Sequence, residues 1–169
     1  MIELVAYDPR WPIDFEAERE RLAEALGPLA RRIDHHGSTA VPRLAAKPII
    51  DIQISVDRLQ PMEPFADPLR AIGYRHVPSA DDDVCPFFHR PHEWPHRHHV
   101  HVVAFGGEEE RRTLAFRDYL RAHAEAAEEY AALKQELAGR YGGGDSAARE
   151  AYAVAKTEFV ERITRLALA

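Results

Sequence analysis

A block of 22 residues near the start of the chain places a Gly-Ser-Thr turn, a lysine and an aspartate close together. Residues 35–56 read HHGSTAVPRLAAKPIIDIQISV. Glycine lets a backbone approach an anion closely, and the N–H groups at the start of a helix point toward such an anion. Gly37, Ser38 and Thr39 are therefore candidate phosphate-binding residues, with Lys47 as a nearby point charge. A turn of this composition is also common before an ordinary buried strand.

Asp51 and two histidines are the candidate metal ligands. An aspartate at the start of a buried strand is costly unless it is paired or bound to a metal. His99 and His101 share one face of a later strand because side chains alternate. If the two strands are neighbours, these three side chains converge on a site that suits zinc, manganese, iron or nickel better than magnesium. Gln53, on the same face as Asp51, would then support a ligand or a bound water. Alternatively, the histidines only line a polar groove.

A weak repeat occurs near the end of the chain, where YAALKQELA and YAVAKTEFV share Tyr, Ala, Lys and Glu at matching offsets. In helices, Tyr130 with Lys134 and Tyr152 with Lys156 would each stand four residues apart on one face. Either both pairs face a phosphorylated ligand, or Tyr and Lys only cover the edges of two amphipathic helices.

The elements that must position these residues follow from apolar spacing and turn residues. The pattern predicts helices over 8–30 and 61–72, the first ended by Gly27-Pro28, and a one-turn helix capped by Ser38 or Thr39. It predicts strands over 33–36, 49–56, 74–77, 85–90 and 98–105. About three helices fill 108–169, divided by GGGDS at 142–146 with Asp145 or Ser146 as a cap. The chain is thus an α/β core, 1–107, followed by C-terminal helices, 108–169, in one domain.

Composition narrows the class of protein. The chain has 169 residues, 46% of them hydrophobic and 30% charged, which is typical of a soluble globular protein. A run of 18 apolar residues, a secretory leader and a second cysteine are all missing, which predicts a cytoplasmic protein without membrane contact. The formal charge of -6 makes a nucleic-acid partner unlikely but leaves room for a small anionic ligand. Six of the ten histidines lie within residues 89–101.

Several motifs together resemble the GrpB family, a group of the nucleotidyltransferase superfamily. They are HHGSTAVPRLAAKPIIDI, YDPRW, GYRH, HHVHV, LAFRDYLRAH and the two Tyr-x-x-x-Lys repeats, and they cover essentially the whole chain. The resemblance implies an α+β fold with a nucleotidyltransferase-like core, in which helices flank a short mixed sheet. It also implies that Gly37 and Ser38 bind a triphosphate and that Asp51 is a catalytic acid holding a divalent metal.

The chain departs from the family and superfamily pattern at three places. Gln53 stands where the superfamily has its second acid, and the third acid falls near His99 or His101. Arg43 stands where the family usually has glycine, so it either reshapes the loop or adds a cation facing the pocket. Consequently the site either uses one metal with a different ligand set or only binds its ligand.

Three functions remain open from the sequence. The first is an enzyme that transfers a nucleotidyl group to a small acceptor with the help of Mg, Mn or Zn. The second is a module that binds a nucleotide, a coenzyme or another phosphorylated small molecule without turnover; some relatives in the family are fused to dephospho-coenzyme A kinase. The third is a histidine-rich protein that binds a transition metal.

Overall fold

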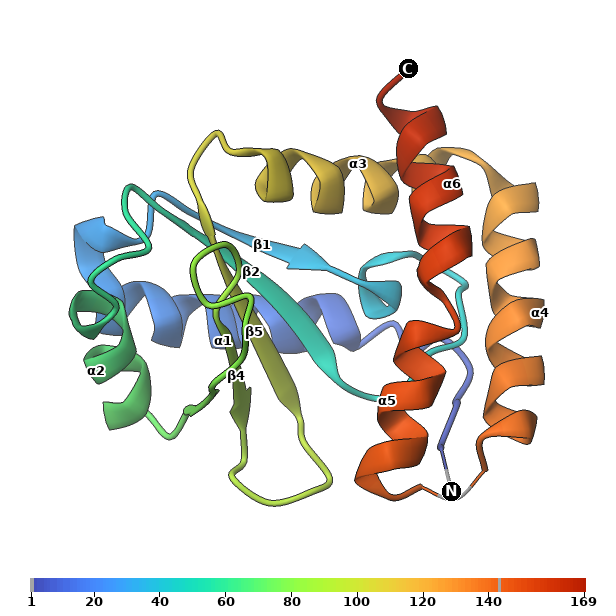
Figure 1. Ribbon diagram of the computed structural model, residues 1–169, viewed down its shortest axis with the longest axis horizontal. Coiled ribbons are helices and arrows are strands. Elements are labelled where there is room, and N and C mark those ends of the chain that lie inside the picture. Colours follow the sequence, from blue (N-terminus) through green and yellow to red (C-terminus); the bar gives the residue numbers. More distant parts are fainter. Residues whose placement is uncertain (1, 143) are drawn as a thin grey trace.

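The computed structural model describes residues 2–142 and 144–169 (Figure 1). Within these residues the strands form one five-stranded mixed sheet, in the order β1-β2-β5-β4-β3. β2 and β5 run parallel, while every other neighbouring pair is antiparallel. The strands span Arg32–His36 (β1), Ile50–Val56 (β2), Arg75–Val77 (β3), Phe87–Arg90 (β4) and His98–Ala104 (β5). The mixed sheet with flanking helices that the sequence predicted is confirmed.

Strand β2 alternates between the core and the face that carries the site. Ile50, Ile52 and Ile54 are buried in the main core, together with side chains from the two helices that cover that side of the sheet. These helices are α1, Trp11–Leu26, and α2, Glu63–Ala71. Because side chains alternate along a strand, Asp51 and Gln53 point to the opposite face. β2 and β5 are neighbours, as the metal hypothesis required, and Asp51 pairs in register with His99.

The C-terminal part of the described chain contains four helices rather than about three. They are α3, Glu108–Ala122; α4, Ala124–Arg140; α5, Ser146–Val154; and α6, Thr157–Ala167. The backbone becomes extended at His123 (φ -124°, ψ 95°), which separates α3 from α4 without glycine or proline. The Asp145 cap is confirmed, since its side chain accepts a hydrogen bond from Ala148 N. Gly143, in the predicted break, lies outside the described residues.

A short loop after the Gly-Ser-Thr turn joins the sheet to these helices. Val41 and Leu44 are buried in a second core, where they pack with Leu120 of α3, Tyr130 of α4 and Phe159 of α6. The rings of Tyr130 and Phe159 stack with their centroids 4.8 Å apart. The C-terminal helices therefore fix the position of the turn, which explains how residues so far apart in sequence meet at one site.

The turn itself is a short 3-10 helix, Ser38–Ala40, preceded by another, Gly27–Leu29, after α1. The expected cap by Ser38 or Thr39 is wrong: Gly37 holds the cap position, and no side chain caps this helix. Thr39 is buried instead and meets the His35 ring at 2.9 Å. Among the described residues, no helix combines the length and apolar character needed to cross a membrane.

Candidate functional site

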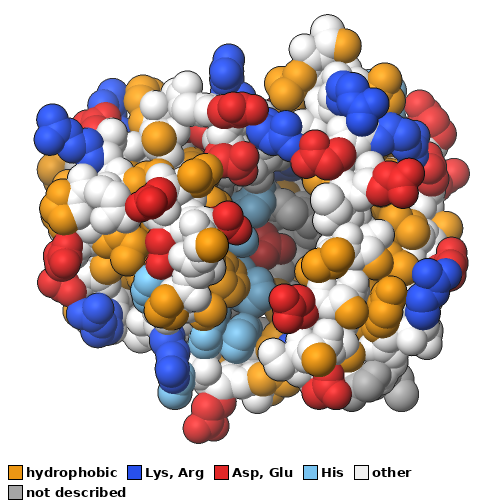
Figure 2. Space-filling view, in the orientation of Figure 1, with side chains coloured by type: hydrophobic (Ala, Val, Ile, Leu, Met, Phe, Trp, Pro, Cys, Tyr) orange, Lys and Arg blue, Asp and Glu red, His pale blue; other side chains and the backbone are white. Residues whose placement is uncertain are grey.

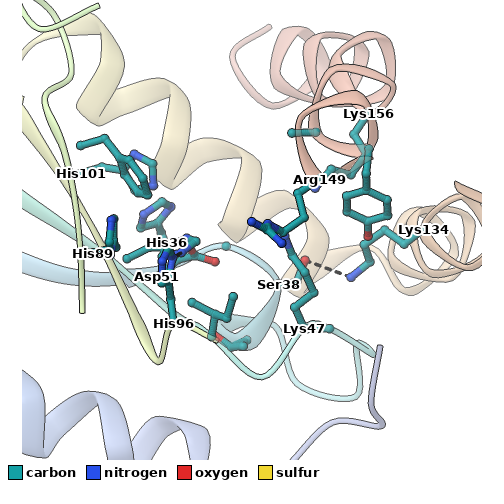
Figure 3. Close-up of a pocket in the computed structure, with 18 of the residues that line it drawn as sticks. His36, Ser38, Lys47, Asp51, His89, His96, His101, Lys134, Arg149 and Lys156 are labelled. Carbon is teal, nitrogen blue, oxygen red and sulfur yellow. Dashed lines mark hydrogen bonds and ion pairs between the residues drawn. The ribbon is translucent and has the colours of Figure 1, made fainter. Parts of the chain in front are cut away.

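A cleft of about 730 Å³ separates the sheet from the C-terminal helices. Figure 2 shows this hollow, with histidines gathered along one wall. Every residue that the sequence singled out as a phosphate or metal ligand lines the cleft: Gly37, Ser38, Thr39, Lys47, Asp51, His99, His101, Tyr130, Lys134, Tyr152 and Lys156. Figure 3 shows two ends of the site, with Asp51 among histidines on one side and Ser38 among cationic side chains on the other.

Gly37 lies directly against Asp51. Its φ of 69° is in the left-handed region, and a Cβ atom at this position would stand 2.5 Å from Asp51 Oδ2. Both the backbone conformation and the close approach therefore require glycine. The absence of a side chain brings the backbone of the turn onto the carboxylate, so the predicted phosphate turn and the predicted catalytic acid form one compact unit.

Two arginines of α3 hold the ends of this turn. Arg117 Nη1 donates to His35 O at 3.0 Å, and Arg121 Nε donates to Ala40 O at 2.8 Å. Hydrogen bonds from a charged donor are stronger than neutral ones. Arg117 and Arg121 thus position the turn, and both belong to the LAFRDYLRAH motif that contributed to the family resemblance.

The chain contains only three lysines, and all three line the cleft. Lys134 is 2% exposed and donates hydrogen bonds to Ser38 Oγ at 3.0 Å and to Ala45 O. Lys156 and Lys47 lie over the ring of Tyr152, with Nζ 4.4 Å and 5.3 Å from its centroid. Within residues 2–142 and 144–169, none of these lysines has a carboxylate within ion-pair distance.

Burial of these unpaired cations has an electrostatic cost. Desolvation, with the nearby charge of Lys156, lowers the pKa of Lys134 to about 7. Desolvation and the charge of Lys47 lower the pKa of Lys156 to about 8, and desolvation also lowers the pKa of Lys47. An anion bound among the three would favour their charged forms and raise these pKa values. A negative charge placed among these lysines would therefore be stabilised.

Two tyrosines lie beside the lysines. Tyr152 is 0% exposed, and its hydroxyl has no hydrogen-bond partner in the described part of the chain. Burial raises the pKa of Tyr152 to about 12 and also raises that of Tyr130, so both hydroxyls stay protonated at neutral pH. The Lys134 ammonium lies 4.8 Å from the Tyr130 ring centroid. The repeated Tyr/Lys pairs of the sequence thus come together in space.

At the other end of the cleft Asp51 contacts a histidine. Its side chain is 27% exposed, and Oδ1 lies 3.5 Å from His99 Nδ1. Burial alone would raise the pKa of Asp51, but contact with His99 and the neighbouring histidines keeps it below its ordinary value. His101 Nδ1 lies 3.8 Å from Cys85 Sγ instead. Burial lowers the pKa of His101 to about 4 and that of His36 to about 3, so both rings are neutral at pH 7.

The residues present do not fit a site for two magnesium ions. Magnesium prefers oxygen ligands, and the carboxylates among the described lining residues are those of Asp51 and Glu150 alone. Gln53 is fully buried, with Nε2 3.5 Å from Glu110 O of α3, and its support of a metal ligand stays a prediction. The described residues contain no group of three acidic, histidine or cysteine side chains placed to hold a metal. Binding of a metal by Asp51, His99 and His101 stays a prediction.

Some residues outside the expected ligand sets also line the cleft. His36, His89, His96 and Arg149 also line the cleft. The histidine-rich segment was a signal for His89 and His96, whereas nothing in the sequence marked Arg149, which reaches the site from α5. Arg43 is exposed, has a φ of 70° and does not line the cleft, so the expectation that it adds a cation there is wrong.

Comparison with known proteins places these features in a family. The protein named UPF0157 protein YqkA of Bacillus subtilis is 38% identical over 142 residues, which cover 83% of this chain and 40% of that one. A protein named dephospho-CoA kinase, from Mycolicibacterium paratuberculosis, is 34% identical over 166 residues, covering 84% of this chain and 41% of that one. The chain therefore spans less than half the length of either relative.

Solved structures support both the family and the fold. The crystal structure of conserved protein GrpB from Enterococcus faecalis has a TM-score of 0.86 and 31% identity, and covers 98% of this chain and 97% of that chain. The Cid1 poly(U) polymerase has a TM-score of 0.53 at 13% identity over 80% of this chain and 44% of that chain, which shows a shared nucleotidyltransferase-like fold only. A sequence model described as GrpB protein matches residues 1–166. The chain belongs to the GrpB family.

Proposed function

We propose that this protein binds a nucleotide or another phosphorylated small molecule in the cleft between the sheet and the C-terminal helices. The phosphates lie against Ser38 and the side chains of Lys47, Lys134 and Lys156. The observation that carries the proposal is the convergence of all three lysines of the chain on one cleft, without a carboxylate partner among the described residues.

Charge and shape both favour a phosphorylated ligand. The chain as a whole carries a formal charge of -6, yet this cleft gathers three ammonium groups and the guanidinium of Arg149. Lys ammonium groups are point charges suited to phosphate, and a cleft with one sign of charge concentrates ligands of the opposite sign. Its volume of about 730 Å³ is within the range typical of small-molecule sites. The nucleotidyltransferase-like fold makes a nucleotide the first ligand to test.

The geometry supports binding more strongly than nucleotidyl transfer. Transfer by two metals needs several carboxylates around the reacting phosphate. Here Asp51 faces the cleft, whereas Gln53, at the second acid position, is buried beneath α3. We therefore propose ligand binding alone, without transfer of a nucleotidyl group.

Isothermal titration calorimetry of the tag-free protein tests the proposal. The ligands are the four ribonucleoside triphosphates, coenzyme A and inorganic tripolyphosphate, each with and without a divalent metal. We expect at least one ligand to bind the native chain. Lys134→Met should weaken that binding about tenfold to a hundredfold, because a hydrogen bond to a charged group is worth about 1.5–3 kcal/mol.

Arg70→Met serves as the matched control, since Arg70 is an exposed cation of α2 outside the cleft. It removes the same formal charge and should leave the affinity within about twofold, because salt screens an exposed charge outside the cleft. Equal losses in the two variants would show that only overall charge matters. Failure of every ligand to bind the native chain would contradict the proposed function.

A further inference from the structure

A second constellation lies at the histidine end of the cleft. His96 belongs to the loop between β4 and β5, and His99 belongs to β5 itself. His96 Nδ1 and His99 Nε2 face each other at 3.0 Å. The ring of His89 is stacked on that of His96, with centroids 3.8 Å apart. Figure 3 shows His89 and His96 near Asp51, on the side of the cleft away from the lysines.

The partners of these rings determine where their protons lie. A carboxylate only accepts hydrogen bonds, so Asp51 Oδ1, 3.5 Å from His99 Nδ1, favours the proton on that nitrogen. His99 Nε2 then carries a lone pair that accepts a hydrogen bond from His96 Nδ1, and a metal ion would replace the proton between the two nitrogens. Likewise His89 Nδ1 lies 2.9 Å from the carbonyl oxygen of Pro91 and must carry a proton to donate to it. Orientation of imidazoles by carboxylate and carbonyl partners is the arrangement that surrounds metal-binding histidines.

We propose that His96 Nδ1 and His99 Nε2 together bind one divalent transition metal of the zinc, cobalt or nickel class, and that Asp51 orients His99 without binding the metal itself. Zinc–nitrogen bonds are about 2.0–2.1 Å long, so two cis ligands stand about 2.9–3.4 Å apart for bond angles between a right angle and the tetrahedral angle. The observed separation of 3.0 Å fits this range without movement of β5. This ligand set differs from the Asp51, His99 and His101 set expected from spacing.

The site has two protein ligands in the described part of the chain, which contains no group of three. The remaining positions are open to water or to a phosphate oxygen of a ligand in the same cleft. Open positions are what distinguishes a reactive metal site from a structural one. The two-histidine site itself does not depend on phosphate binding.

The test is zinc binding to tag-free protein that has been stripped with a chelator and titrated by calorimetry without any phosphate ligand. We expect the native chain to bind one zinc ion. The zinc affinity should fall at least a hundredfold in His96→Ala and in His99→Ala. His92→Ala is the matched control, because His92 lies in the same loop, is exposed and does not line the cleft. It should bind zinc like the native chain.

Two further variants assign the role of Asp51. As a positioning residue, Asp51→Ala should lose about 10–100-fold in zinc affinity, and Asp51→Asn, which retains an accepting oxygen, should recover most of it. A complete loss in both variants would make Asp51 a ligand and overturn the assignment. The proposed zinc site would be overturned if His96→Ala and His99→Ala kept the native affinity for zinc. It would also be overturned if the native chain bound no zinc. The zinc titration contains no phosphate ligand, so failure here is separate from failure of phosphate binding.

Discussion

Gly37 and Arg43 both have a positive φ, but for different reasons. Gly37 has a φ of 69° and sits where a side chain would strike Asp51, while Arg43 has a φ of 70° although it carries a side chain. A left-handed conformation costs roughly 1–2 kcal/mol for a residue other than glycine. The glycine is thus needed by the site, whereas the arginine is strained without contributing to the cleft.

Gly37→Ala should destabilise the fold and weaken phosphate binding together. The new methyl group would meet Asp51 Oδ2 in addition to the backbone strain. Gly106→Ala is the matched control, because Gly106 also has a φ of 69° but has no atom within 4 Å of an added Cβ. Urea unfolding should show a larger loss for Gly37→Ala, and calorimetry should show weaker phosphate binding in that variant alone. If Gly37→Ala and Gly106→Ala lost stability and phosphate affinity equally, the close approach of Gly37 to Asp51 would be contradicted.

Arg43→Gly should stabilise the protein by about 0.5–1 kcal/mol, since relief of left-handed strain exceeds the entropy that glycine adds to the unfolded chain. The measurement is the midpoint of urea unfolding. Because Arg43 is outside the cleft, phosphate affinity should stay unchanged. A lower midpoint, or a weaker affinity, would show that this arginine makes a contribution the structure does not contain.

At the scale of elements, the loop of Val41 and Leu44 links the phosphate turn to the C-terminal helices. Leu44 is 2% exposed in the second core. Replacement of a buried leucine by alanine typically costs about 2–5 kcal/mol. Because Ser38 and Lys134 meet across this junction, looser packing of the helices would also separate the groups proposed to hold the phosphate.

Leu44→Ala should therefore lower both the unfolding midpoint and the affinity for phosphate ligands. Leu166→Ala is the comparison, since Leu166 belongs to α6 but is 51% exposed. We expect little effect from it, because its side chain contributes little buried surface. If Leu44→Ala lost stability but kept the full affinity at a temperature where it is folded, the helices would not position the turn.

The elements also show what the sequence could predict. Periodicity located α1, β2 and β5 because strong alternation or helical spacing is bounded there by Gly or Pro. The division of α3 from α4 was missed because His123 is extended without any turn residue, and the neighbouring residues all favour helix. The predicted cap by Ser38 or Thr39 is wrong because the Ser38 hydroxyl accepts a hydrogen bond from the distant Lys134, and the Thr39 hydroxyl meets the neighbouring His35 ring.

The site was predictable in its residues but not in its contacts. Strand alternation placed Asp51, His99 and His101 on one face, and the Tyr/Lys repeat indicated Lys134 and Lys156. No pattern in one sequence states that α3 covers Gln53 or that α5 brings Arg149 to the cleft. Such facts depend on the packing of helices distant in sequence, which local spacing does not determine.

At the scale of the whole molecule, the cleft is a basic site in an acidic chain, and its affinity should depend on pH. The pKa of Lys134 is about 7 and that of Lys156 about 8 in the free protein, both lowered by burial. A bound phosphate favours the charged amines and raises both values. The protein therefore takes up protons on binding near pH 8, and affinity falls as the pH rises through this range.

Calorimetry in two buffers of different ionisation enthalpy measures this proton uptake. We expect net uptake at pH 8 for the native chain and a smaller uptake for Lys134→Met. Arg70→Met should match the native chain, because Arg70 is exposed and lies outside the cleft. Net proton release by the native chain would contradict the charge arrangement of the cleft.

If the three lysines surround the bound phosphates, a ligand should protect their amines from chemical labelling. Because the chain contains no other lysine, every modified lysine reports on the cleft. Mass spectrometry follows the rate at which an acylating reagent modifies the half-buried Lys47 and Lys156, with and without a saturating nucleotide or tripolyphosphate. We expect the ligand to slow modification of both residues severalfold. Unchanged labelling rates in the presence of a ligand shown to bind would contradict it.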